Sequence, residues 1–264
     1  MELELFQVSA FTQDPFAGNP ACVIPLQKWL PDDLLLKIAR ENAVAETAFY
    51  MEEGPGFKLR WFTPEMEMDL CGHATLATAH VIKNIKKFSG RNIIFDTRSG
   101  KITVSFKDSR YLLDLPNRDP TPHGMPLLLK DSLNLQPVEV LKARDFVLVF
   151  PSENSIKEIQ INRNYFDRLE LGTGGVIVTA PGDECDFVSR FFTPGASVFE
   201  DPVTGSAHCS LIPYWSKKLG RSKMKARQLS ERGGELFCTL KEDRIEVAGH
   251  AVTYFAGSLL LDSV

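Results

Sequence analysis

The sequence lacks the features of several classes of protein. Its 30 basic and 34 acidic residues give a net charge of −4, and the basic residues are scattered, so a polyanion such as nucleic acid finds no positive patch. No apolar run approaches the roughly 18 residues of a membrane span. The first residues, MELELFQVSAFT, lack the basic start and apolar core of a signal peptide. We therefore expect a cytoplasmic protein without nucleic-acid or membrane partners.

The sequence also lacks cofactor and metal motifs. Its five cysteines are odd in number, widely spaced and never in a C-x-x-C pair, which indicates reduced thiols and argues against disulfide scaffolds and structural zinc. GTGGV (172 to 176) is followed by strand-like VIVTA, so it lacks the helix that a dinucleotide loop needs. His73 and His80 have no third ligand nearby in the sequence. We expect neither a cofactor nor a metal.

What the chain does contain is strand-like alternation. With 264 residues, 44% of them hydrophobic, it can bury one large core or two modest ones. Alternating segments predict strands, and helices are expected at 32 to 42, from near Gly72 and from near Gly205. The segment LPNRDPTPHGMP (115 to 126) is rich in proline and predicts a boundary. We expect lobes at 1–118 and 119–264, and the last strand could pack back on the first lobe. The strand segments are LELFQVSAFT, FKLRWFT, NIIFDTR, KITVSF, YLLDLP, VIVTA, DFVSRFF, ELFCTL, RIEVAG and VTYFAGSLLL.

Two distant segments resemble each other. Residues 61 to 82 (WFTPEMEMDLCGHATLATAHVI) and 191 to 215 (FFTPGASVFEDPVTGSAHCSLIPYW) each have an aromatic strand ending in Phe-Thr-Pro. A polar loop follows, and then a glycine opens an apolar helix. Repetition at half the chain length predicts two similar lobes, with chance similarity as the alternative.

The helix predicted in GHATLATAHVI is apolar nearly all round, so we expect it to be buried. Its N-terminal N–H groups and the positive end of its dipole then point inward and need an acceptor or an anion. With one such helix in each lobe, two anion-binding helix ends could converge on one cleft.

Several segments together resemble a known family, the PhzF-like isomerases of the phenazine biosynthesis group, which are related in fold to diaminopimelate epimerase. The resemblance implies an α+β fold with two pseudo-symmetric lobes, each a curved, mostly antiparallel sheet around a central helix, and a cleft between them. EDPVTGSAH is closer to the broad family, including its eukaryotic phenazine-biosynthesis-like members, than to the phenazine enzyme itself, so the substrate stays open, as does a homodimer. The matching segments are AFTQDPFAGNPACVI (10 to 24), NAVAETAFY (42 to 50), RWFTPEMEMDLCGHATLATAH (60 to 80), FFTPGASVFEDPVTGSAH (191 to 208) and RGGEL (232 to 236).

Glu46 is the candidate catalytic residue. In ARENAVAETAFYME (39 to 52) it is the one acid at the junction between a helical and a strand-like pattern. Apolar neighbours disfavour the charged form of a carboxylate, which suits proton transfer near neutral pH. The resemblance implies that Glu46 is the family's acid/base. The alternative is a glutamate that caps or pairs at the end of the 32 to 42 helix.

The resemblance also implies residues around the substrate. His73 is expected to donate to a substrate group or orient it, against the alternative of a satisfied histidine at a helix start. Asp201 is expected to bind an amine or hydroxyl, although aspartate before proline is also a common turn residue. Gly72, Gly205 and Ser206 are expected to hold a carboxylate with helix-start N–H groups and a hydroxyl. The amide of Asn19 is a weaker candidate.

Cys71 separates two kinds of chemistry. Diaminopimelate epimerase and related racemases use one cysteine from each lobe, but residues 200 to 206 (EDPVTGS) contain none, and Cys209 lies a helical turn further on, where we expect it to be packed. We therefore expect a cofactor-independent isomerase of a small carboxylate-bearing metabolite that moves a proton through Glu46. The alternatives are an amino-acid racemase or epimerase, and a binding protein that has lost catalysis.

Overall fold

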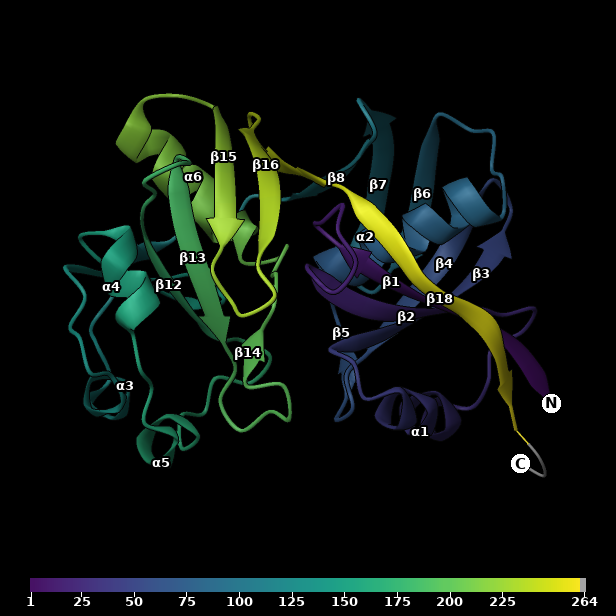
Figure 1. Ribbon diagram of the computed structural model, residues 1–264, viewed down its shortest axis with the longest axis horizontal. Coiled ribbons are helices and arrows are strands. Elements are labelled where there is room, and N and C mark those ends of the chain that lie inside the picture. The colour runs from purple at the N-terminus through teal and green to yellow at the C-terminus, as the bar shows by residue number, and fades with distance from the viewer. Residues whose placement is uncertain (262–264) are drawn as a thin grey trace. The chain divides into compact units, whose positions relative to one another are not determined.

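The computed structural model describes residues 1–261 of the chain, which divide into two compact units (Figure 1). Unit 1 contains Met1–Asp114 together with the chain from Ala248 onward, and unit 2 contains Leu115–Val247. Unit 2 is therefore an insertion within unit 1. None of the helices in the described residues combines the length and the apolar character needed to cross a bilayer.

Unit 1 is built on one sheet with the strand order β18-β1-β2-β3-β4-β6-β7-β8, and the short β5 pairs with the end of β4. Neighbours are antiparallel except for β2–β3 and β4–β6, because α1 and α2 connect those pairs and bring the chain back in the same direction. The elements are β1 (Glu2–Ala10), β2 (Asn19–Pro25), α1 (Asp32–Asn42), β3 (Glu46–Glu53), β4 (Gly56–Phe62), β5 (Glu67–Met68), α2 (Gly72–His80), η1 (Val81–Ile85), β6 (Asn92–Thr97), β7 (Gly100–Lys107), β8 (Arg110–Pro116) and β18 (Ala251–Leu260).

Helix α2 is the central helix of unit 1. All nine of its residues are buried, and it packs against β1, β2, β3 and β18 (Figure 1). It begins at Gly72 as expected and passes after His80 into the π-helical turn η1. His80 lies between two hydroxyl groups, 2.9 Å from Tyr111 Oη and 2.8 Å from Thr253 Oγ1. The prediction of a buried helix is confirmed.

Helix α1 leads the chain to the candidate acid. It covers the predicted residues, with Pro31 before its first turn and two aspartates within that turn, where they favour the positive helix end. Its buried side pairs Leu35 and Ile38 with the apolar cluster around Phe49 and Phe62. The helix ends at Ala43, whose left-handed backbone (φ 50°) turns the chain toward β3.

Unit 2 repeats this plan. Its strands follow the order β9-β10-β11-β12-β13-β15-β16, the short β14 pairs with the end of β13, and the parallel pairs are β11–β12 and β13–β15. Helix α6 is buried from His208 to Ser216 and packs against β15 and β16. The elements are β9 (Thr121–Pro122), α3 (Leu127–Ser132), β10 (Glu139–Lys142), β11 (Phe146–Val149), α4 (Glu153–Glu158), α5 (Arg163–Phe166), β12 (Val176–Pro181), β13 (Phe187–Phe192), β14 (Glu200–Asp201), α6 (His208–Leu219), β15 (Lys223–Gln228), β16 (Gly234–Leu240) and β17 (Arg244–Gly249).

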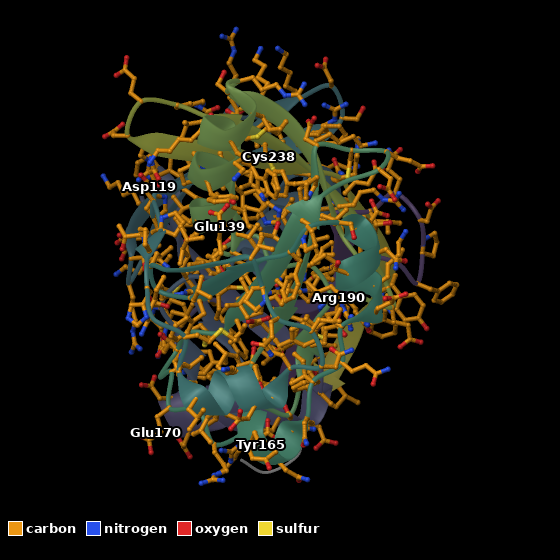
Figure 2. All side chains as sticks on the ribbon, turned by 90° about the vertical axis from the view of Figure 1, so that its left-hand side faces the viewer. Asp119, Glu139, Tyr165, Glu170, Arg190 and Cys238 are labelled. Carbon is orange, nitrogen blue, oxygen red and sulfur yellow. The ribbon has the colours of Figure 1, made fainter. Side chains whose placement is uncertain are left out.

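The repeat extends to individual contacts. Arg60 on β4 donates two hydrogen bonds of 2.7 Å to Glu67 on β5. Arg190 on β13, labelled in Figure 2, donates bonds of 2.7 and 2.8 Å to Glu200 on β14. Phe62 pairs with Glu67, and Phe192 pairs with Glu200. The two segments are therefore equivalent parts of a repeated unit.

These strand registers define which residues are equivalent. Gly72 follows Glu67 by five residues, and Gly205 follows Glu200 by five; we call these two the helix-entry glycines. Thr47 pairs with Phe62, and Val176 pairs with the equivalent Phe192. The resulting equivalent positions are Glu46 with Gly175, Met68 with Asp201, Cys71 with Thr204, Gly72 with Gly205 and His73 with Ser206.

One helix boundary differs from the expectation. Helix α6 begins at His208 rather than near Gly205. Residues 205 to 207 form a tighter turn, in which the His208 N–H donates to the Gly205 carbonyl oxygen and the Cys209 N–H donates to that of Ser206, both at 3.1 Å. Such i to i+3 bonds are common where an α-helix begins, so the glycine opens a turn that leads into the helix.

Candidate active site

Glu46 and His73 face each other within unit 1. Glu46 is the first residue of β3, and His73 is the second residue of α2. Glu46 Oε2 lies 3.1 Å from His73 Nε2; the glutamate side chain keeps 14% of its surface exposed, whereas the histidine keeps 2%. The cap N–H at the end of α1 donates instead to the Ala39 carbonyl. Glu46 therefore pairs with the central helix and does not cap α1.

Asn19 and Cys71 approach the other nitrogen of the same ring. Asn19, the first residue of β2, is fully buried and places Nδ2 3.0 Å from His73 Nδ1. Cys71 Sγ is 3.6 Å from that nitrogen. The imidazole is thus held on one side by an amide and a thiol, and its other side faces the carboxylate. Three residues singled out from the sequence, together with Cys71, form one group, in which Glu46 is partly exposed and the other three are buried.

Opposing effects act on the pKa of His73. Burial lowers it, and the negative charge of Glu46, with that of Cys71 where the thiol is ionised, raises it above the usual value. Burial and the nearby Glu46 carboxylate raise the pKa of Cys71 to about 11. The thiol therefore stays protonated at neutral pH, and Glu46 is the neighbour whose negative charge favours a protonated His73.

The Asn19 amide can match either charge state of His73. With Nδ2 toward the ring, the amide donates to Nδ1, and the ring proton lies on Nε2 toward Glu46. An imidazolium carries protons on both nitrogens. Rotating the amide by 180° then places its oxygen toward Nδ1 as an acceptor. The site can thus hold His73 neutral or charged beside the acid.

The start of α2, which carries His73, also supplies backbone N–H groups. Cys71 occupies the N-cap position in an extended conformation, and α2 has no side-chain cap. The first N–H groups of a helix have no partner within the helix, and the dipole makes this end positive. The arrangement is suited to a carboxylate or to negative charge that develops during a reaction.

The same side chains include donors that metals use. One donor atom each from Glu46, Cys71 and His73 lies within 4.8 Å of the others. A metal ion would have to displace the proton of the Cys71 thiol, and within the described residues no further His, Cys, Asp or Glu joins this group. The carboxylate beside an imidazole is better suited to moving a proton.

In unit 2, Asp201 is held by a buried hydrogen-bond network. Thr204 Oγ1 donates to Asp201 Oδ2 at 2.5 Å. Gln228 on β15, which is 1% exposed, accepts from the Thr204 N–H at 2.8 Å and donates to the Asp201 carbonyl at 2.7 Å. Asp201 thus has a fixed position. Sequence reasoning missed Gln228, although its two-residue spacing from Met224 and Ala226 places all three on the buried face of β15.

Ser206 lies in the turn before α6 and is 8% exposed. Its Oγ accepts a hydrogen bond of 3.1 Å from Arg144 Nη2. Sequence reasoning also missed Arg144, which comes from the segment before β11. Gly205 and Ser206 are adjacent in this turn, so these predicted residues lie together within unit 2. Cys209 is fully buried as expected.

Comparisons with known proteins agree with this architecture. A family model described as "Phenazine biosynthesis-like protein" matches residues 8–257. An uncharacterised isomerase of Pseudomonas aeruginosa is 47% identical, over 99% of this chain and 100% of its own. The crystal structure of a PhzF-family protein of Enterococcus faecalis has a TM-score of 0.93 and 42% identity, over 99% of this chain and 100% of its own.

A predicted epimerase of Pseudomonas aeruginosa shares the fold, with a TM-score of 0.74 and 18% identity over 98% of this chain and 100% of its own. The expected α+β fold of the epimerase type is confirmed.

Proposed function

Because the chain belongs to the PhzC-PhzF family of phenazine biosynthesis-like proteins, as its motifs predicted, we propose that it isomerises a small carboxylate-bearing metabolite. Its family relationship supports an isomerase or epimerase. In our proposal Glu46 is the acid/base that moves one proton between two carbons, and no cofactor takes part.

The observation that carries this proposal is the difference between equivalent positions of the two units. Where unit 1 has Glu46, Cys71 and His73, unit 2 has Gly175, Thr204 and Ser206. A glycine has no side chain to move a proton, and the two hydroxyl groups do not ionise near neutral pH. A racemase that uses two opposed bases needs a second one. The asymmetry favours a reaction with a single acid/base.

The proposed reaction is balanced in protons. The Glu46 carboxylate takes a proton from one substrate carbon, and the electron pair left there delocalises toward the substrate's unsaturated group. The N–H groups at the start of α2 stabilise the negative charge that develops. Protonated Glu46 then returns the proton to a different carbon, while His73 beside Oε2 orients the carboxyl group.

The test removes only the proton transfer. Glu46→Gln keeps the size of the side chain, so we expect a folded protein whose turnover falls by about 10²–10⁴-fold, the usual contribution of a general acid/base. Glu53→Gln, at the exposed end of the same strand, is the matched control and should keep wild-type activity. Activity of the Glu46 variant within about tenfold of wild type would exclude Glu46 from this role.

The product decides the class of reaction. Small carboxylates are screened with the wild-type protein, and the product of any that is converted in deuterated water is analysed by mass spectrometry. We expect the mass of the substrate, with deuterium added where the reprotonated carbon has exchanged. A change of two hydrogens, of water or of ammonia would contradict an isomerase. Binding of a carboxylate without any conversion would favour the binding-protein alternative.

A further inference from the structure

Four residues of unit 2 form a continuous chain of hydrogen bonds that ends at Ser206. The Gly175 N–H donates to Asp145 Oδ1 at 2.9 Å. Arg144 donates to both oxygens of the Asp145 carboxylate at 3.2 Å, and its Nη2 also donates to Ser206 Oγ at 3.1 Å. Asp145 is 2% exposed, so its charge needs this pairing. The Arg144 guanidinium is therefore held in place by Asp145 and directed at the turn that contains Ser206.

The glycines of GTGGV allow this chain to form. A Cβ at Gly174 would lie 2.8 Å from the Arg144 carbonyl oxygen, and one at Gly175 would lie 2.4 Å from the ring of Phe191. Both distances are shorter than real contacts, so a larger residue at 174 would separate this turn from the Arg144 segment, and one at 175 would displace the neighbouring strand β13. The motif serves the close approach of two backbones, which explains glycines that resemble a dinucleotide loop but lack its helix.

We propose that Arg144 is a positioning residue that fixes the Ser206 hydroxyl as a donor to a substrate carboxylate. This inference rests on the proposed function and adds to it the role that the family resemblance implies for the Ser206 turn, which is to hold the substrate carboxylate. A guanidinium only donates, so Arg144 occupies a lone pair of Ser206 Oγ, and the hydroxyl hydrogen must point elsewhere. Asp145 balances the charge of Arg144, so the arginine acts chiefly through the direction of this hydroxyl.

The repeat supports a positioning role. In unit 1, Asn19 from β2 bonds to His73, the residue after the helix-entry glycine. In unit 2, Arg144 from the segment before β11 bonds to Ser206, which occupies the position equivalent to His73. Each unit thus uses a side chain from the corresponding part of its sheet to hold the same helix-entry position. One held group is an imidazole beside an acid, and the other is a hydroxyl.

A double-mutant cycle tests the coupling, with succinate as the probe and the amide signals of Gly205 and Ser206 followed by nuclear magnetic resonance. We expect Ser206→Ala and Arg144→Met each to weaken succinate binding about tenfold, as for the loss of a hydrogen bond to a charged group. The double variant should bind no more weakly than either single variant, because Arg144 acts through Ser206. Independent, multiplying losses of about a hundredfold would overturn the proposal.

Two further variants separate positioning from charge and from folding. If Arg144→Met weakens binding only by leaving Asp145 unpaired, then adding Asp145→Asn restores the affinity and overturns the proposal; we expect no restoration. Arg144→Lys, which keeps a donor, should recover part of the affinity and remains informative should Arg144→Met fail to fold. Arg227→Met, which removes an exposed ion pair with Glu184, is the control and should bind normally.

Failure of the proposed function gives a different result. If succinate leaves the Gly205 and Ser206 signals of the wild-type protein unchanged, the carboxylate site itself is absent and both proposals fall. If succinate shifts these signals equally in wild type and Arg144→Met, only the role of Arg144 is overturned.

Discussion

At the scale of the residue, the two reactive side chains beside His73 differ in their fitness for proton transfer. Glu46 is partly exposed, which lets its carboxylate meet a substrate. Cys71 is 4% exposed, and its pKa is raised to about 11. A thiol that is buried and protonated is a poor base at neutral pH. This difference favours Glu46 over Cys71 as the acid/base of the proposed reaction.

This difference predicts the effect of removing the thiol. Cys71→Ser should fold and keep most of the wild-type turnover, measured as kcat with any carboxylate that the protein converts. Cys22→Ser, at another buried thiol on β2, controls for the packing cost of a buried hydroxyl. If Cys71→Ser alone loses turnover while both variants have the same melting temperature, the racemase alternative would be favoured over the single acid/base.

The sequence could predict the residues of this site only in part. Glu46 and His73 were singled out because an acid among apolar residues and a histidine at a buried helix start are visible as local patterns, and the family resemblance implied their roles. Arg144 and Gln228 were not found. They reach Ser206 and Thr204 from segments 62 and 24 residues away, and such contacts depend on strand order, which no local pattern encodes.

At the scale of the element, the entry to α6 is tied to its loop by a neutral histidine. His208 Nδ1 donates to the Thr204 carbonyl oxygen at 2.9 Å. The residue is fully buried, and burial lowers its pKa to about 4. Because the folded state favours the neutral ring, the stability that this residue contributes is present above the unfolded pKa of about 6.5 and is lost as pH falls toward 4.

The prediction is a change in the pH dependence of stability. In wild type, the free energy of unfolding in urea should fall between pH 6.5 and 4, with up to about 3 kcal/mol of the fall due to His208. His208→Asn keeps an N–H donor for Thr204 and does not titrate, so its stability should fall less over this range. His80, whose pKa burial also lowers to about 4, still contributes in the variant. An equal fall in both proteins would contradict the assignment.

Elements were predictable where their apolar pattern was regular. The ten alternating segments all form strands, and α1 has the predicted limits. The strands β2, β11 and β15 were not predicted, for different reasons. NPACVIP contains prolines at two positions, FVLV is apolar on both faces and too short to show a period, and KMKARQ is mostly polar. Each is a strand because its neighbours in the sheet pair with it.

At the scale of the whole molecule, the insertion of unit 2 makes unit 1 depend on the end of the chain. Strand β18 pairs with β1 along its length, from Glu2↔Leu260 to Ala10↔Ala251. Thr253 on this strand also contacts His80 at the end of α2. The sheet of unit 1 therefore receives its edge strand, and its central helix one of its contacts, from residues that follow unit 2.

This dependence predicts unequal effects of truncation. Removal of the chain from residue 251 should expose Phe6 and Val8, which are buried on β1, and should raise amide hydrogen exchange throughout unit 1. Amides of β12 and β13 in unit 2 should stay protected, because their partners remain. A chain ending at residue 261 is the control. Protection of α2 and β1 retained in the shorter chain would show that β18 is dispensable.

The insertion also sets an order of events during synthesis. When residue 249 has left the ribosome, every strand of unit 2 through β17 has been made, whereas β1, made first, still lacks β18, the neighbour that is made last. Glu46 and His73 by then occupy a sheet with an open edge. Unit 1, which bears the acid, can thus complete its sheet only after unit 2 has been made, so a chain whose synthesis stops just before β18 would contain every strand of unit 2 but lack the last strand of unit 1.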